Sequence, residues 1–310
     1  MAIAIVVTDR DVSFLQKKIK AQLPQGVDVW VYPNIPDYAK VELAILWKHP
    51  PDILKKFPQL RLVSSLGAGV EHILDDFNLP EDISITRIVD TQLTQSMRNY
   101  VLMAVLNIHK QFRFYQQNQR HRRWTKPAQV EIPLKIGVLG IGTLGGAIAQ
   151  TLANLGFSVF GYSQSPKRLD GISCFSPADF PLTRFVRRIN LLICLLPRTS
   201  TTEGILNYGL FQHMPPSSYL INVARGAHLV EADLLRAIES GIITEAYLDV
   251  FQEEPLPPDH PFWDNRKIVV TPHIASITNP ENAAAIISEN YRRLKAGEAL
   301  LYEVNREKGY

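Results

Sequence analysis

The sequence of 310 residues has little cysteine, little net charge and no long apolar run. Its two cysteines, Cys174 and Cys194, lack the spacing of metal ligands, which favours a reduced compartment and argues against a zinc site. No apolar stretch approaches the roughly 18 residues that a membrane helix needs. A formal net charge of +3 gives no general attraction for nucleic acid. We therefore expect a cytoplasmic protein with no metal, no membrane partner and no nucleic-acid partner.

Two short segments resemble targeting or binding signals but have simpler structural interpretations. The N-terminal MAIAIVVTDR has one short apolar run followed by charge, so we interpret it as a first strand and expect no signal peptide. The basic run QRHRRW at 119–124 departs from the low overall charge, but such a run is typical of a solvated helix end.

Short apolar segments alternate with helical patterns along the chain, which is typical of doubly wound α/β domains with parallel sheets. The expected strands lie at 2–7, 27–32, 41–47, 61–67 and 83–89, then at 135–140, 157–162, 189–197, 218–224, 244–250 and 267–272. Apolar residues at spacings of three and four predict a long helix from about Thr91 to beyond His109 between the two series, and another over 283–294. We therefore predict a discontinuous first domain, residues 1–97 with 279–310, into which a second domain, residues 98–278, is inserted.

A glycine loop opens the second series. In KIGVLGIGTLGGAIAQ, Gly140, Gly142 and Gly145 stand in G-x-G-x-x-G register between an apolar strand and a helix. Gly140 permits a tight turn, Gly142 lets the backbone approach a pyrophosphate, and Gly145 lets the helix pack on the strand. The diphosphate would lie at the positive helix N-terminus. The loop therefore predicts a Rossmann domain that binds a dinucleotide.

An acidic residue is missing where the ribose of NAD is usually bound. The segment VFGYSQSPKR at 159–168 places Ser163 at that position, and Ser163, Gln164 and Ser165 can donate hydrogen bonds. Lys167 and Arg168 can supply positive charge to a 2′-phosphate. We therefore expect NADPH as cofactor. NADH is the alternative, because these two cations could equally face solvent.

Further motifs follow in a fixed order: LGAGVEHIL (66–74), the glycine loop, LINVARGAHL (220–229), LDVFQEEPLP (248–257) and VVTPHIAS (269–276). Together they resemble the D-isomer-specific 2-hydroxyacid dehydrogenase family across nearly the whole chain. Within it the chain is most similar to bacterial reductases of glyoxylate and hydroxypyruvate, notably in Trp47 and the acid-free loop at Ser163. The resemblance implies a flavodoxin-like substrate-binding domain at 1–97 and 279–310, a Rossmann domain at 98–278, and hydride transfer to a small 2-keto acid.

The chemistry of that reaction explains three of the residues. A carbonyl that receives a hydride also needs a proton donor charged near neutral pH, a role that fits His273. A nearby carboxylate would raise the pKa of the imidazole, and the resemblance assigns this to Glu254, with Glu253 as the competing candidate. Arg225 offers a fork of donors that fits the carboxylate and polarised carbonyl of the substrate.

The resemblance also implies the other contacts. The glycine-rich turn Gly67, Ala68 and Gly69 would approach the substrate carboxylate, so that the substrate lies in a cleft between the domains. Trp47 would contact the substrate too, and Asp249 the nicotinamide amide. The expected cofactor contacts beyond those named above are Thr143, Leu144, Leu195, Pro197 and Val223. The family's dimer predicts a homodimer, with QRHRRW as part of the arm that wraps the partner.

Two alternatives stay open from the sequence. Nucleotide-sensing corepressors share this fold, although no peptide-docking extension is evident here. A dehydrogenase of a different 2-hydroxy acid would carry the same Arg225, Glu254 and His273. Trp47 and Trp124 could narrow the pocket toward acids of two or three carbons, or could equally be core residues.

Overall fold

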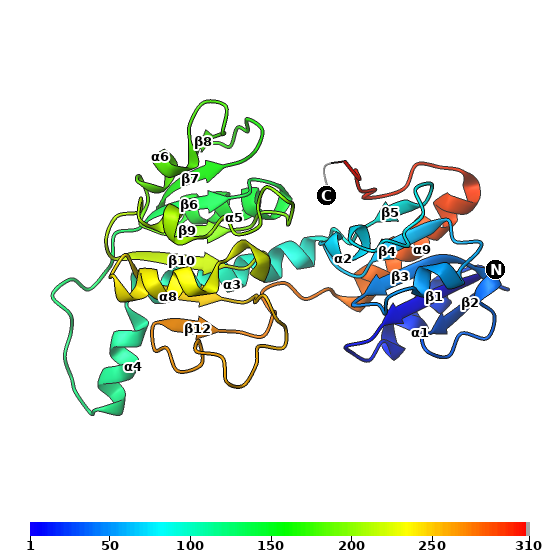
Figure 1. Cartoon of the computed structure of the whole chain (residues 1–310), viewed down its shortest axis with the longest axis horizontal. Helices are drawn as coiled ribbons and strands as arrows, with labels where there is room; N and C mark the ends of the chain where they lie inside the picture. Colours follow the sequence, from blue (N-terminus) through cyan, green and yellow to red (C-terminus); the bar gives the residue numbers. More distant parts are fainter. Residues whose placement is uncertain (308–310) are drawn as a thin grey trace. The chain divides into compact units, whose positions relative to one another are not determined.

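The computed structural model describes residues 1–307, and the chain divides into two compact units. The first unit comprises Met1–Leu93 and the segment from Ile277 onward, and the second comprises Thr94–Ser276. Each unit has its own parallel sheet flanked by helices (Figure 1). This confirms the expected α/β class with two parallel-sheet domains, one inserted into the other. The roles assigned to the two units stay predictions at this point.

The first unit contains a five-stranded sheet in the order β2-β1-β3-β4-β5, with all neighbours parallel. The strands are β1 (Ala2–Val7), β2 (Asp28–Val31), β3 (Val41–Trp47), β4 (Leu62–Ser65) and β5 (Ser84–Thr86). Helices α1 (Ser13–Gln22) and α9 (Pro280–Ala296) contribute to the apolar cluster on one face, and the short α2 (Glu71–Leu74) contributes to the other. The C-terminal helix α9 thus packs on the sheet that the N-terminal segment forms.

Helix α9 has clear chemical start and stop signals. The side chain of Asn279 accepts hydrogen bonds from the backbone N–H groups of Glu281 and Asn282, and Pro280 occupies the first turn. The helix ends at Gly297, whose φ of 70° lies in the left-handed region that glycine tolerates.

The second unit contains a seven-stranded sheet in the order β12-β11-β10-β9-β6-β7-β8, again parallel. The strands are β6 (Lys135–Leu139), β7 (Ser158–Tyr162), β8 (Ser173–Phe175), β9 (Leu191–Cys194), β10 (Ser218–Asn222), β11 (Ile243–Leu248) and β12 (Ile268–Val270). The strand order reverses between β6 and β9, the place where open α/β sheets bind ligands.

Helices cover both faces of this second sheet. One apolar cluster includes α6 (Leu182–Val186), α7 (Tyr208–Phe211) and α8 (Glu231–Glu239), and the other includes α3 (Thr91–His109) and α5 (Thr143–Asn154). Val138 and Leu139, consecutive in β6, belong to opposite clusters, as side chains that alternate along a strand must. Burial on both faces is the reason that these strands are apolar almost throughout.

Three details differ from what the sequence predicts. The strand β8 is absent from the predicted strands because it is short, and Ser173 at its start is exposed. Helix α3 ends at His109 itself, and a separate helix α4 (Phe112–Arg120) follows. Trp124 is not a core residue of this chain, since its side chain is fully exposed at 102%.

Among the described residues, no helix is long and apolar enough to cross a membrane. Within residues 1–307 there is also no group of three or more His, Cys, Asp or Glu side chains placed to hold a metal ion.

Candidate active site

The three residues assigned to the reaction follow three neighbouring strands of the second unit. Arg225 follows β10, Glu254 follows β11 and His273 follows β12. Because these strands are parallel and paired in register, their C-terminal ends lie at one edge of the sheet. Residues separated by 48 positions in the sequence, from Arg225 to His273, therefore lie in loops at the same edge of the sheet.

Glu254 and His273 form a direct pair. His273 Nδ1 lies 2.8 Å from Glu254 Oε2, and both side chains are partly buried, at 34% and 22% exposure. The other carboxylate oxygen, Oε1, accepts from the backbone N–H of Phe251 at 3.2 Å, which fixes the carboxylate plane. Glu253 is exposed and has no such contact to His273, so geometry favours Glu254 of the two candidates. A carboxylate at Nδ1 directs the other ring nitrogen, Nε2, to a substrate.

The loop that bears His273 is held by the carboxylate of Asp249. Asp249 Oδ1 accepts from Thr271 Oγ1 at 2.6 Å and from the Ile274 N–H at 2.9 Å, and Oδ2 accepts from the Ala275 N–H at 2.7 Å. Asp249 is 1% exposed, and this burial raises the pKa of its carboxyl group, an effect that the three hydrogen bonds oppose. These bonds let His273 adopt a left-handed φ of 56°, which few non-glycine residues do.

Tyr100 extends this hydrogen-bonded chain from helix α3. Its hydroxyl lies 2.6 Å from Thr271 Oγ1, and since Thr271 uses its only proton toward Asp249, Tyr100 must be the donor. Burial raises the pKa of Tyr100 to about 12, so this donor keeps its proton throughout the neutral range. No sequence motif marks Tyr100 or Thr271 as part of the site. The contact of Asp249 with the nicotinamide amide stays a prediction.

Arg225 lies in a turn that packs against the chain leading to Glu254. A Cβ on the next residue, Gly226, would lie 1.9 Å from the carbonyl carbon and oxygen of Phe251, so only glycine fits there. Arg225 itself is extended, with φ −142° and ψ 148°, and its Nη1 donates to the Ala224 carbonyl at 2.6 Å. The turn that bears Arg225 thus lies beside the loop of the Glu254–His273 pair.

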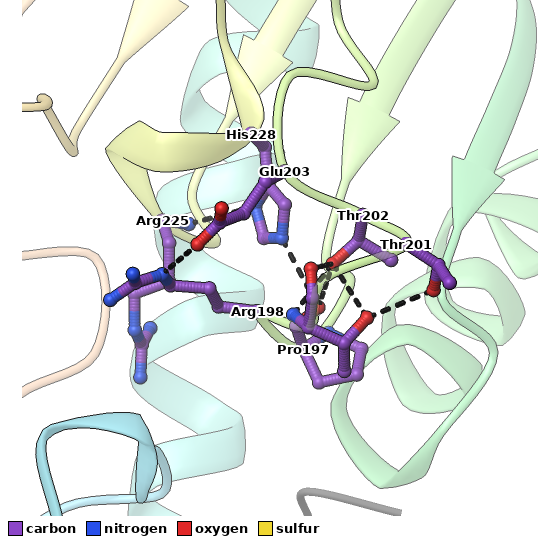
Figure 2. A network of polar contacts seen from close by, with 8 residues as sticks. Pro197, Arg198, Thr201, Thr202, Glu203, Arg225 and His228 are labelled. Carbon is purple, nitrogen blue, oxygen red and sulfur yellow. Dashed lines mark hydrogen bonds and ion pairs between the residues drawn. The ribbon is translucent and has the colours of Figure 1, made fainter. Parts of the chain in front are cut away.

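A buried histidine stands between Arg225 and the loop after β9 (Figure 2). His228 Nδ1 accepts from the Arg225 backbone N–H at 3.3 Å, and His228 Nε2 lies 3.2 Å from the Pro197 carbonyl oxygen. That same oxygen accepts from Thr202 Oγ1 at 2.7 Å, and Arg198 pairs with Glu203 in the same loop at 2.7 Å. The motif VARGAHL contains His228, but its sequence alone does not indicate a role for this residue.

The glycine loop has the local geometry that its pattern predicts. Gly140 has φ +96°, and a Cβ there would lie 2.6 Å from the Leu195 carbonyl oxygen. A Cβ on Gly145 would lie 1.9 Å from the Gly140 carbonyl oxygen, so the helix α5 packs directly on the turn. Gly142 differs, because a Cβ there would meet nothing within 4 Å. Open space at the N-terminus of α5 fits a dinucleotide phosphate.

The acid-free loop follows β7 directly. Ser163 is 8% exposed, its backbone N–H donates to Phe175 O at 3.1 Å, and its hydroxyl donates to Ser165 O at 2.7 Å. Gln164, Ser165, Lys167 and Arg168 are exposed. Leu195 and Pro197 follow β9, and Val223 follows β10, so these expected cofactor contacts share the edge of the sheet where the glycine loop lies.

In the first unit, the structure brings Trp47 and Gly67 together. A Cβ on Gly67 would lie 2.7 Å from Trp47 Cζ3, so the indole occupies the space that any side chain at 67 would need. Ser65 closes the turn that follows, since its hydroxyl donates to the Gly69 carbonyl at 2.6 Å and accepts from the Gly67 N–H at 3.2 Å. Ser65, which no sequence motif marks, thus shapes the Gly67–Gly69 turn.

A doubly wound domain with a glycine loop, and a histidine–carboxylate pair beside an arginine, define a nucleotide-dependent oxidoreductase. The family described as D-isomer specific 2-hydroxyacid dehydrogenase, NAD binding domain, matches residues 102–275. The chain belongs to this family, as its motifs indicated, and it is an NAD(P)-dependent 2-hydroxyacid dehydrogenase.

Named relatives are similar over most of the chain. Glyoxylate/hydroxypyruvate reductase A of Serratia proteamaculans (strain 568) is 42% identical over 288 residues, 90% of each chain. The protein of the same name from Photorhabdus laumondii is 42% identical over 280 residues, 88% of this chain and 89% of that one.

Two solved structures share the whole fold. A D-isomer specific 2-hydroxyacid dehydrogenase from Xanthobacter autotrophicus Py2, in complex with NADPH and MES, has a TM-score of 0.93 at 37% identity and covers 100% and 99% of the two chains. An NADPH-dependent glyoxylate/hydroxypyruvate reductase from Sinorhizobium meliloti, in complex with NADP and sulfate, has a TM-score of 0.92 at 32% identity with the same coverage.

Proposed function

We propose that this protein reduces small 2-keto acids with NADPH, converting glyoxylate to glycolate and hydroxypyruvate to glycerate. The observation that carries the proposal is the Glu254–His273 contact of 2.8 Å, with Arg225 in the turn after the adjacent strand. The reductases named above support the substrate class, and their complexes with NADPH or NADP support the cofactor.

A nicotinamide held by the second unit would supply the hydride for the carbonyl carbon of the substrate. Arg225 binds the substrate carboxylate through its guanidinium fork and polarises the carbonyl, which stabilises the oxyanion as it forms. His273 donates the proton to that oxygen from Nε2, and the Glu254 carboxylate at Nδ1 stabilises the charged imidazole before transfer. Asp249 keeps the His273 loop in place by its three hydrogen bonds.

Residues that we propose to hold the cofactor lie along the edge of the second sheet. The backbone of Gly140, Gly142, Thr143, Leu144 and Gly145 would meet the diphosphate, because the space beside Gly142 is open. Leu195, Pro197, Val223 and Asp249 would border the nicotinamide half. Ser163, Gln164, Ser165, Lys167 and Arg168 would receive the 2′-phosphate, since no carboxylate in this loop repels it.

The phosphate loop gives a testable preference. Ser163→Asp should shift the ratio of kcat/KM for NADPH over NADH toward NADH by about 100-fold, because a carboxylate a few ångströms from a 2′-phosphate costs several kcal/mol. The matched control is Ser163→Asn, because asparagine has the shape of aspartate without its charge. This variant should leave the ratio of kcat/KM for NADPH over NADH nearly unchanged. If the aspartate variant keeps the original ratio, the 2′-phosphate is bound elsewhere.

The first experiment compares steady-state kcat/KM for NADPH and NADH, each with glyoxylate and with hydroxypyruvate. We expect NADPH preference and turnover of both acids. Tight NADPH binding without turnover of any small keto acid would overturn the proposal and favour a nucleotide-sensing role.

The same kinetic comparison with longer 2-keto acids tests whether the physiological substrate is a different acid. Trp47 lies beside the turn of the proposed substrate contacts Gly67, Ala68 and Gly69. If its indole limits the size of the substrate, Trp47→Ala should raise kcat/KM for the longer acids relative to glyoxylate.

We also propose that the protein is a cytoplasmic homodimer. Met103, Leu106, Phe112 and Trp124 expose large apolar side chains along α3, α4 and the segment after them. A second copy that covers this surface would remove those side chains from water. Light scattering of the purified protein should give twice the chain mass, and a single-chain mass at micromolar concentration would contradict the dimer.

A further inference from the structure

The histidine between the Arg225 turn and the loop after β9 is completely buried. His228 has 0% exposure, yet each of its two ring nitrogens meets a backbone group of a different segment. Nδ1 faces the Arg225 N–H at 3.3 Å, and Nε2 faces the Pro197 carbonyl at 3.2 Å (Figure 2). We propose that His228 is a positioning residue that sets Arg225 for the substrate and Pro197 for the cofactor, an inference that rests on the proposed function.

The two partners determine the protonation of the ring. Nδ1 must carry a lone pair, because it accepts from a backbone N–H, and Nε2 must carry the proton, because the carbonyl of Pro197 only accepts. With these two contacts Nδ1 is the acceptor and Nε2 is the donor. A charged ring would place an N–H at Nδ1 against the Arg225 N–H, so this histidine is unsuited to proton transfer and suited to holding two loops.

Backbone contacts show that these two segments are already adjacent without the ring. Gly204 N–H donates to Ala227 O at 2.9 Å, and Leu206 N–H donates to His228 O at 2.8 Å. An apolar side chain could fill the space beside this bridge. What only the imidazole adds is an acceptor for Arg225 and a second donor to the Pro197 oxygen, which also accepts from Thr202 Oγ1. The ring thus acts on the positions of two residues with proposed ligand contacts.

Two amide variants separate the two hydrogen bonds of the His228 ring, one to Arg225 and one to Pro197. In His228→Asn the side-chain Oδ1 takes the place of Nδ1 and can still accept from Arg225, whereas nothing reaches Pro197. In His228→Gln the side-chain Nε2 can still donate to Pro197, whereas the Arg225 N–H is left buried without an acceptor. His228→Leu keeps the apolar bulk and removes both hydrogen bonds.

The expected effects differ in kind between the variants. His228→Gln should raise KM for glyoxylate about 30-fold, since an unsatisfied buried donor displaces the guanidinium, while the NADPH dissociation constant stays within about threefold. His228→Asn should show the reverse pattern, with KM for glyoxylate nearly unchanged and the NADPH dissociation constant raised about fivefold, a smaller effect because Thr202 still donates to Pro197. His228→Leu should show both changes.

The readouts are steady-state kinetics, NADPH fluorescence titration and melting curves, all on the full chain. Equal losses in the Asn and Gln variants that track a lower melting temperature would mean a packing role and would overturn the inference, as would unchanged constants in His228→Leu. Failure of the proposed function is distinguishable, because the wild-type protein would then show no turnover of small keto acids, and the inference would fail with it. If the wild-type protein is active and the Asn and Gln variants lose the same constants to the same extent, only the inference fails.

Discussion

Arg225→Ala should lower kcat/KM for glyoxylate about 1000-fold while NADPH binding remains measurable. The guanidinium is the group proposed to bind the substrate carboxylate and to stabilise the oxyanion, and its loss affects both the bound substrate and the transition state. The glycine loop that is proposed to bind the cofactor diphosphate follows a different strand, β6, so the dissociation constant of NADPH should change little. Steady-state kinetics measures kcat/KM for glyoxylate, and fluorescence titration measures the dissociation constant of NADPH.

Arg225→Lys is the matched control, since it keeps the charge and removes the planar fork. It should retain part of the substrate binding but lose most of kcat, because an ammonium group does not bind carboxylate and carbonyl together in a fixed geometry. Turnover of Arg225→Ala close to wild type would remove this residue from the site.

His273→Asn should lower kcat for keto-acid reduction about 1000-fold, the size of the effect of losing a general acid. Asparagine is the variant of choice because it tolerates the left-handed conformation at φ 56°, so the loop bonded to Asp249 stays in place. Stopped-flow absorbance of NADPH measures the hydride step directly. A hydride rate near that of wild type would mean that the proton comes from another donor.

Glu254→Gln tests the pair by its effect on turnover. Glutamine keeps the size of the side chain but removes the negative charge that faces His273 Nδ1. We therefore expect kcat for keto-acid reduction to fall about 100-fold, as measured by steady-state kinetics. The double variant His273→Asn, Glu254→Gln should be little worse than His273→Asn alone, because the two side chains act as a unit. A kcat of Glu254→Gln close to that of wild type would separate Glu254 from proton donation.

The positions of most strands along the chain and the local form of the glycine loop were predictable because each depends on neighbours in sequence. Apolar runs buried on both faces marked most of the strands, and the G-x-G-x-x-G spacing marked the turn before α5. The strand β8 was not predictable in this way, because its three residues carry little periodic signal and pair only at an edge of the sheet. The family, too, was evident from motifs that the comparisons confirm.

The sequence by itself determined the fold class, the glycine loop and the candidates Arg225 and His273, and it left Glu254 and Glu253 as competing carboxylates, since these depend on residue type and local spacing. Tertiary structure alone decided that Glu254 rather than Glu253 faces His273, that Asp249 and Tyr100 brace the His273 loop, and that His228 joins two segments. The reason is physical: hydrogen bonds between loops at the end of a parallel sheet depend on strand order and backbone direction, which no short stretch of sequence contains.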